Sequence, residues 1–140
     1  MKRLLFSIFT TITLTGFGHE IDSIPVGPQI EFLNLTMDYD TIERYSNGTR
    51  TFTFYNTGDE PLIISEVKSG CSCTVPSYTK DTVFPGERGE ISAKFNTKKP
   101  GKFDRPLTVF SNATNASKVT INITGFVLDP KKKWGIEHKK

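Results

Sequence analysis

The chain has 140 residues, two cysteines and a formal net charge of +3, and hydrophobic residues make up 36% of it. This is enough for one domain with its own core. The segment from His19 to Pro130 holds 11 basic and 14 acidic residues, so the positive charge comes from the two ends. A nucleic-acid-binding domain carries its basic residues on the folded body, so this charge distribution argues against a nucleic-acid partner.

Residues 1–18 have the order of parts found in a secretory signal peptide. Lys2 and Arg3 precede an uncharged, apolar and Thr-rich stretch, and Gly16 and Gly18 at its end supply the small residues that a signal peptidase recognises. The stretch is too short to span a bilayer comfortably. A buried N-terminal strand or a retained anchor is the alternative. The sequence favours a secreted, periplasmic or cell-surface protein with no transmembrane segment after signal cleavage.

Residues 19–29 contain two prolines and a glycine and are predicted to form an extended leader. Alternation of apolar and polar residues then predicts seven strands, separated by turn sequences such as that at Asn47 and Gly48. The alternation is clearest where Phe52 and Phe54 face one side and the residues between them face the other. The predicted strands cover residues 30–34, 37–44, 51–55, 62–67, 90–95, 107–110 and 119–124.

Two of the segments depart from this alternation. The predicted strand over residues 62–67 begins with three consecutive apolar residues, so both of its sides are apolar there, as can be the case for a strand in the middle of a sandwich. Pro76 begins a stretch that is predicted to be irregular.

About seven short strands without a helical period predict an all-β fold. The expected architecture is an immunoglobulin-like β-sandwich over residues 30–128, with two sheets in which antiparallel pairing dominates. The likeness is one of architecture only, because the single tryptophan, Trp134, lies in the tail and the antibody-type arrangement of Cys and Trp is absent from the sequence.

Residues 129–140 form a predicted basic tail. Its last ten residues, from Lys131 to Lys140, include five lysines and one glutamate. Such a tail is most often solvated and mobile. Contact with an acidic glycan or with an anionic membrane surface is the alternative.

Cys71 and Cys73 are the candidates for unusual chemistry, as a disulfide or a redox pair. In a regular strand their side chains would lie too far apart to bond, so a bridge needs a bend, which Gly70 permits. Three interpretations stay open: a structural pair, bridged or simply buried; a redox or intermolecular thiol pair; and a soft-metal site, most plausibly for Cu(I). Two thiolates alone leave that metal under-coordinated, and both histidines lie near the chain ends.

Catalysis finds little support in the sequence. The motifs of serine hydrolases, zinc proteases and P-loop enzymes are absent. Asp38 with Asp40, and Asp59 with Glu60, fall in turns or short edges, where solvating charges are a simpler interpretation than a general acid–base pair. We therefore predict no enzymatic activity, no catalytic residues, no cofactor and no metal site.

Five asparagines begin an N-x-Ser/Thr sequence and would be glycan acceptors in a eukaryotic secreted protein. In a bacterial protein they are by-products of asparagine in turns and threonine in strands. The five candidate glycosylation sites are Asn34, Asn47, Asn112, Asn115 and Asn122.

Five strings occur in order along the chain: FTFYNTGDEPLIISEV, GCSCTVP, PGERGEISAKFNT, GKFDRPLTVFSN and VTINITGFV. Together they resemble the bacterial secreted family known as domain of unknown function fifteen seventy-three, which is related to immunoglobulin-type domains of the Hydin and major-sperm-protein kind. The resemblance covers roughly residues 30 to 127. Family members usually have Cys-Gly-Cys-Thr where this chain has Ser72 between its cysteines. The resemblance implies a sandwich fold and an exported protein, and it implies no established activity.

These features together predict an exported, non-enzymatic β-sandwich module for protein interaction or scaffolding in the periplasm or at the cell surface, with an unknown protein as its partner. Two routes to that partner are physically reasonable: strand addition at an exposed sheet edge, and contacts through the loops near residues 71–78. The alternative function is that of a thiol-redox or copper-handling protein centred on the loop of Cys71, Ser72 and Cys73.

Overall fold

The structure is a computed structural model that describes residues 26–131. The predicted signal peptide, residues 19–25 of the leader and residues 132–140 of the tail lie outside the described residues. The described part contains no helix and has eight strands. They are β1 (Ile30–Phe32), β2 (Thr36–Glu43), β3 (Thr49–Asn56), β4 (Ile64–Ser69), β5 (Thr74–Tyr78), β6 (Arg88–Phe95), β7 (Gly101–Ser111) and β8 (Lys118–Leu128).

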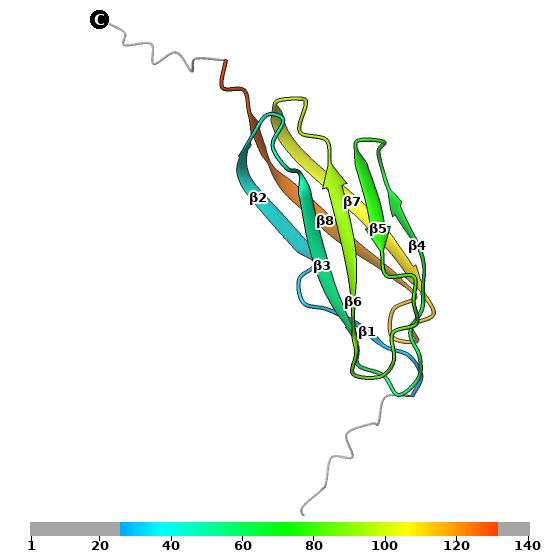
Figure 1. Cartoon of the computed structure of the whole chain (residues 1–140). Helices are drawn as coiled ribbons and strands as arrows, with labels where there is room; N and C mark the ends of the chain where they lie inside the picture. The colour runs from blue at the N-terminus through cyan, green and yellow to red at the C-terminus, as the bar shows by residue number, and fades with distance from the viewer. Residues whose placement is uncertain (1–25, 132–140) are drawn as a thin grey trace, which may run out of the picture.

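The strands form two four-stranded sheets that pack face to face (Figure 1). The strand order is β1-β3-β6-β5 in one sheet and β2-β8-β7-β4 in the other. Every pairing between these strands is antiparallel except that of β2 with β8, which is parallel. The predicted all-β, immunoglobulin-like sandwich is therefore confirmed, with one strand more than the seven expected.

Inward-facing side chains of both sheets fill the core. In β3, Phe52 and Phe54 are fully buried, as the alternation of the sequence predicts. At one end of the core, the rings of Phe95 and Phe103 stack with their centroids 4.1 Å apart. Because β6 and β7 belong to different sheets, this ring pair joins the two layers.

The prediction of an irregular stretch from Pro76 onwards is wrong for Pro76–Tyr78, whereas residues 79–87 lie outside the strands. Thr74–Tyr78 form β5, which pairs with β6 at the edge of its sheet. An edge strand tolerates proline because the missing N–H can face away from the neighbouring strand. The proline signal that argues for irregular structure is therefore compatible with a strand at this particular position.

The prediction of a central strand over residues 62–67 is also wrong. β4 begins only at Ile64 and lies at the edge of its sheet, while Leu62 forms an isolated bridge with Val83. Ile63 is 45% exposed, so the continuous apolar run does not reflect burial on both faces.

The turn predicted at Asn47 and Gly48 lies slightly earlier in the chain. Left-handed backbone occurs at Tyr45, with φ 68°, and Gly48 is not among the residues with positive φ. Gly48 serves close packing instead, because a Cβ at this position would collide with the carbonyl oxygen of Phe95.

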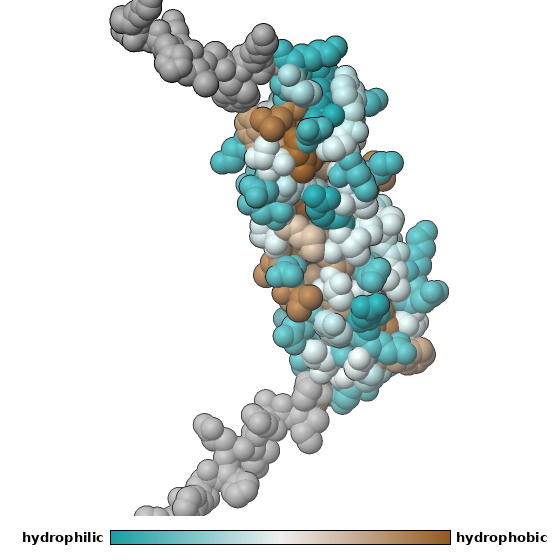
Figure 2. All heavy atoms as spheres, turned by 60° about the vertical axis from the view of Figure 1, so that its left-hand side comes forward, coloured by the Kyte–Doolittle hydropathy of each residue, from teal (hydrophilic) through white to brown (hydrophobic). Residues whose placement is uncertain are grey.

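The described chain enters the sandwich at the end where β1 begins and leaves it at the opposite end, after β8 (Figure 1). Figure 2 shows one face of the domain, on which hydrophobic side chains form small, separate patches among hydrophilic ones. Within residues 26–131, no helix is long and apolar enough to cross a membrane.

Candidate functional site

Three connections that cross from one sheet to the other meet at the end of the sandwich where β8 finishes (Figure 1). They are the β2–β3 connection over residues 44–48, the β4–β5 connection over residues 70–73 and the β6–β7 connection over residues 96–100. We call these three connections the disulfide end. Loops held by rigid sheets are a frequent place of binding on such scaffolds, which makes this end the candidate site.

The β4–β5 connection holds a disulfide between Cys71 and Cys73, whose Cα atoms are 5.3 Å apart. The cysteines lie in a bend and a turn, which supplies the change of direction that a bridge across one residue needs. The Ser69 hydroxyl donates to the carbonyl oxygen of Cys71 at 3.0 Å. Oγ1 of the buried Thr74 lies 3.9 Å from Sγ of Cys71. The disulfide loop is thus braced by two hydroxyl side chains at the ends of the adjoining strands.

The disulfide loop is also fixed to the β6–β7 connection. The backbone N–H of Asn96 donates to the carbonyl oxygen of Cys73 at 2.8 Å. The side-chain oxygen of Asn96 accepts a hydrogen bond from the N–H of Lys98 at 3.0 Å. One asparagine therefore anchors the disulfide loop and shapes the turn that carries Lys98.

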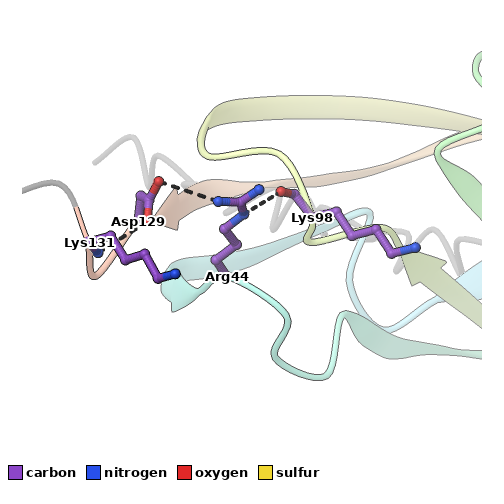
Figure 3. A network of polar contacts seen from close by, with 4 residues as sticks. All are labelled: Arg44, Lys98, Asp129 and Lys131. Atoms are coloured by element: carbon purple, nitrogen blue, oxygen red, sulfur yellow. Dashed lines mark hydrogen bonds and ion pairs between the residues drawn. The ribbon is translucent and has the colours of Figure 1, made fainter.

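Arg44 joins the β2–β3 connection to the same turn (Figure 3). Its Nε donates to the carbonyl oxygen of Lys98 at 2.7 Å, and its Nη1 lies 3.5 Å from a carboxylate oxygen of Asp129. The other carboxylate oxygen of Asp129 accepts from the N–H of Lys131 at 3.1 Å. The side chain of Lys98 extends away from this network (Figure 3), so its ammonium group is not used in holding the turn.

Tyr39, in β2, supports the disulfide end from the core. Its hydroxyl donates to the carbonyl oxygen of Gly48 at 2.7 Å, and the side chain is 4% exposed. Burial raises the pKa of Tyr39 to about 12, although the positive charge of Arg50 opposes the shift. The Arg50 guanidinium lies 4.3 Å from the centre of the Tyr39 ring. The buried hydroxyl therefore stays protonated and keeps its hydrogen bond at physiological pH.

Two hollows open on the disulfide end. The first has a volume of about 480 Å³ and lies against the start of β7, where the two sheets meet. The second has a volume of about 780 Å³ and lies against the β2–β3 connection and the outer side of β5. The two hollows share five lining residues, which are Ser72, Cys73, Phe95, Asn96 and Lys98. The disulfide loop thus forms part of the wall of both.

Basic side chains gather around these hollows. Lys98 lines both, Lys94 lines the second, and Lys99, Lys102 and Arg105 line the first. Neither lining contains Asp or Glu. This cluster was not predicted, because the net negative charge of the body conceals it. The signal was present in the sequence as five basic residues and one acidic residue within residues 94–105.

Two of the predicted glycan acceptors form hydrogen bonds through both the oxygen and the nitrogen of their side-chain amides. Asn112 accepts from the N–H of Ile63 at 2.8 Å and donates to the carbonyl oxygen of Pro61 at 3.1 Å. Asn115 bonds both backbone groups of Ile30, at 3.0 Å each. A glycan on Nδ2 of either residue would replace one of the two hydrogen atoms of a nitrogen that donates within the fold.

The other three acceptor asparagines lie in different settings. Asn122, in β8, donates from Nδ2 to the carboxylate of Asp104 at 2.7 Å. Asn34 and Asn47 are exposed in connections between strands, and Asn47 accepts from the N–H of Thr49 at 2.9 Å. Asn34 and Asn47 are therefore the positions where an attached sugar fits the folded surface best.

The acidic residues singled out in the sequence support local structure. Asp38 accepts a hydrogen bond at 2.8 Å from the N–H of Asp40, which has left-handed backbone with φ 57°. Asp59 accepts from the N–H of Gly27 at 2.6 Å. In the part of the chain that the structure describes, no group of three or more His, Cys, Asp and Glu side chains is placed to hold a metal ion. Copper binding stays an untested alternative that concerns the reduced protein, because both cysteine sulfurs lie in the disulfide here.

Several solved structures have a similar fold. A protein of unknown function from Porphyromonas gingivalis W83 matches with a TM-score of 0.64 and 11% identity, over 74% of this chain and 49% of that chain. This chain therefore spans about half the length of that protein. The ASH/PapD-like domain 7 of human CEP192 matches with a TM-score of 0.60 and 11% identity, over 88% of this chain and 99% of that chain. The Vibrio cholerae VesB protease matches with a TM-score of 0.59 and 13% identity, over 70% of this chain and 32% of that chain.

At these identities the structural likeness shows the fold alone. No curated protein matches the chain. Residues 30–127 match the family described as "Protein of unknown function (DUF1573)", which confirms the resemblance found in the sequence motifs. Because the matched range takes in the whole sandwich except the last residue of β8, the chain belongs to the DUF1573 family.

Proposed function

We propose that the chain is an exported, non-enzymatic β-sandwich module that binds a partner protein in the periplasm or at the cell surface. The observation that carries the proposal is the disulfide end, where three cross-sheet connections are held together by hydrogen bonds and enclose two hollows. Loops that are ordered before contact bind at a lower entropic cost than loops that become ordered on binding. The disulfide end therefore suits recognition.

The sheet edges support strand addition less well than the loops support binding. In β5, Pro76 lacks the N–H that an added strand would bond. In β2, a shift of register between Asp38 and Thr41 interrupts the pairing with β8. Prolines, irregularities and charges on edge strands are typical of sheets that avoid pairing with another chain. We therefore favour the loops as the binding region.

The lining of the hollows favours binding over catalysis. It contains no Asp, Glu or His, which are the side chains that most often act as general acid or base. The exposed Ser72 on the rim has no carboxylate or imidazole beside it in either lining. A serine without such a base is a weak nucleophile.

Export is supported by the sequence of residues 1–18 and by the disulfide, because disulfides persist in oxidising compartments and are rare in the cytosol. Sequencing the N-terminus of protein purified from its native cells tests this part of the proposal. We expect His19 as the first residue of the mature protein. A native protein that begins at Met1 would contradict cleavage of a signal peptide after Gly18.

A photo-crosslinking amino acid placed at Ser72 in native cells tests the binding region. The matched control is the same group at Phe84, which is 55% exposed and lies in the β5–β6 connection at the opposite end of the sandwich (Figure 1). We expect a discrete protein adduct from Ser72 and none from Phe84. Adducts from Phe84 alone, or from neither position, would contradict binding through the disulfide end.

The position of the disulfide also supports a second candidate function, thiol–disulfide exchange with a partner dithiol. Cys71 and Cys73 are partly exposed, and Cys73 lines both hollows, so an incoming thiolate can reach it. Attack on Sγ of Cys73 would form a mixed disulfide and release Cys71 as a thiolate. The second thiol of the partner would then displace Cys73, which leaves the partner oxidised and both cysteines reduced.

The double substitution Cys71→Ser with Cys73→Ser separates this candidate from a structural pair. Loss of dithiol oxidation in a variant that stays folded at the assay temperature would support exchange. Loss of stability alone would support a structural role for the bridge.

A further inference from the structure

We infer that the two hollows of the disulfide end bind an extended, acidic segment of a partner protein, with its carboxylates beside the basic residues and its apolar side chains against the floor that the hollows share. This inference rests on the proposed function and deepens it, because it assigns the chemistry of the partner at the same site.

Basic residues are concentrated around the two hollows of the disulfide end. Of the residues that the structure describes between 26 and 130, five of the 11 basic ones line the hollows and none of the 12 acidic ones does. The ion pairs found within residues 26–131 use other side chains, which are Arg44 with Asp129, Lys68 with Glu66, and Arg88 with Glu90. A concave surface lined by charges of one sign focuses its field and attracts ligands of the opposite sign. The disulfide end is therefore suited to an anionic ligand, although the body as a whole is acidic.

Arg105 is the best placed of these residues to hold a carboxylate. By the alternation of β7 it faces the same side as the buried Phe103. Its Nη1 donates to the carbonyl oxygen of Asp104 at 2.9 Å, while its Nε is buried and has no acceptor among the described residues. A guanidinium presents its donors in a planar fork that matches a carboxylate. A carboxylate in the first hollow would thus meet a guanidinium whose donors are not all in use.

The floor of the hollows favours a protein segment over an acidic polysaccharide or a membrane. Phe95 and Cys73 line both hollows, and Val75, which is 63% exposed, lines the second. An extended peptide places alternate side chains on opposite sides, so one segment can present carboxylates to the basic residues and apolar side chains to this floor. A polysaccharide has no apolar side chains to cover the floor, and a membrane surface is too flat to enter the hollows.

The test is a titration of the isotope-labelled, disulfide-bonded protein with two short synthetic peptides, followed by amide chemical shifts. One peptide alternates glutamate with leucine, and the other alternates glutamine with leucine. We expect the glutamate peptide to shift the amides of residues 71–75 and 94–105, and we expect the glutamine peptide to bind at least about tenfold more weakly. Added salt should weaken the binding of the glutamate peptide.

Two matched variants locate the charge effect. Lys98→Gln with Lys102→Gln removes two charges from the hollows, and we expect it to weaken binding about tenfold. Lys68→Gln with Lys118→Gln removes two charges elsewhere, beside Phe110, and we expect less than about a twofold change. Equal weakening by the two variants, or equal binding of the two peptides, would overturn the inference.

A sulfated oligosaccharide and anionic vesicles complete the test. If either shifts the same amides at a lower concentration than the glutamate peptide does, the occupant is not a protein segment and the inference falls. Crosslinks from Ser72 that persist while the glutamate peptide fails to bind would overturn only the acidic chemistry of the segment. Crosslinks that are absent from Ser72 would overturn the binding region itself.

Discussion

The backbone N–H of Asn96 donates to the carbonyl oxygen of Cys73 at 2.8 Å, and this bond holds the disulfide loop against the turn that carries Lys98. Asn96, Cys73 and Lys98 all line both hollows. The disulfide loop and the turn that carries Lys98 are therefore joined directly through the backbone at the end of β6.

Removing the disulfide should leave the fold intact. The bridge joins residues only two positions apart, so it restricts the unfolded chain very little, and we expect its loss to lower the free energy of unfolding by about 1–2 kcal/mol. Urea unfolding of the Cys71→Ser, Cys73→Ser variant measures the difference. The reduced wild-type protein is the control and should behave like the variant; a loss above about 4 kcal/mol would show that the bridge does more than restrict the chain.

Gly89 should not tolerate a larger side chain. It lies opposite Phe54 in the pairing of β3 with β6, and a Cβ at this position would overlap the ring of Phe54. That ring is fully buried, so it has little room to move aside. We expect Gly89→Ala to lower the free energy of unfolding by about 1–3 kcal/mol in chemical denaturation.

Two further variants test the cause of that loss. Gly70→Ala is the matched control, because a Cβ there meets nothing within 4 Å, and it should change stability by less than about 0.5 kcal/mol. Phe54→Leu should relieve the overlap, so that Gly89→Ala costs less in that background than in the wild type. Strict additivity of the two substitutions would show that the ring is not the cause.

The side-chain amide of Asn56 should be required for the stability of the fold. It is fully buried at the end of β3. Its Oδ1 accepts from the N–H groups of Gln29 and Gly58, and its Nδ2 donates to the carbonyl oxygens of Glu60 and Val83. Asn56→Asp would bury a carboxylate and turn one of its oxygens towards two carbonyl oxygens. We expect a loss of about 3 kcal/mol or more in the free energy of unfolding at neutral pH.

The exposed Asn47 supplies the control for that substitution. Its Oδ1 accepts from the N–H of Thr49, and a carboxylate can accept the same bond. Asn47→Asp should therefore change stability by less than about 0.5 kcal/mol. A similar loss in the two variants would mean that added charge, and not burial of the amide at Asn56, is responsible.

Tyr39 should make stability depend on pH in the alkaline range. Its pKa in the folded protein is raised to about 12, so the folded state holds the phenol proton more tightly than the unfolded state does. The resulting stabilisation is complete below the unfolded pKa of about 10 and is lost as the pH rises from there to about 12. We expect a loss on the order of 2 kcal/mol over this interval, measured by denaturation at each pH.

Tyr39→Phe should separate the two contributions of this residue. At neutral pH the variant should lose about 1 kcal/mol, because the hydrogen bond to Gly48 is gone, and it should lack the part of the alkaline loss that belongs to Tyr39. Arg50→Gln should raise the pKa of Tyr39 further, because the charge of Arg50 opposes the shift. A fall in the Tyr39 pKa in that variant, followed by the absorbance of tyrosinate, would contradict this account.

The strands that could be predicted are those whose burial alternates residue by residue. In β3 and β6 one side chain in two faces the core, and this repeat is visible in the sequence itself. β5 and β4 lie at sheet edges. At an edge, a proline does not exclude a strand, and an apolar run does not indicate a strand that is buried on both faces. The parallel pairing of β2 with β8 joins distant segments, and no local pattern specifies it.

The candidate site could be predicted only in part. The cysteine pair is visible because its two residues are close together in the sequence. The basic hollows are not, since their walls come from three connections that only the folded sheets bring together. The crowding of lysines between residues 94 and 105 is the local signal that could have pointed to them.

β8, the last strand in the part of the chain that the structure describes, is an inner strand of its sheet, with β2 on one side and β7 on the other. Until β8 has left the ribosome, this sheet consists only of β7 paired with β4, and β2 has no strand to pair with. Completion of this sheet has to wait until β8 has left the ribosome, because β2 cannot pair with β8 earlier. A polypeptide that must be threaded through a translocation channel would benefit from that delay.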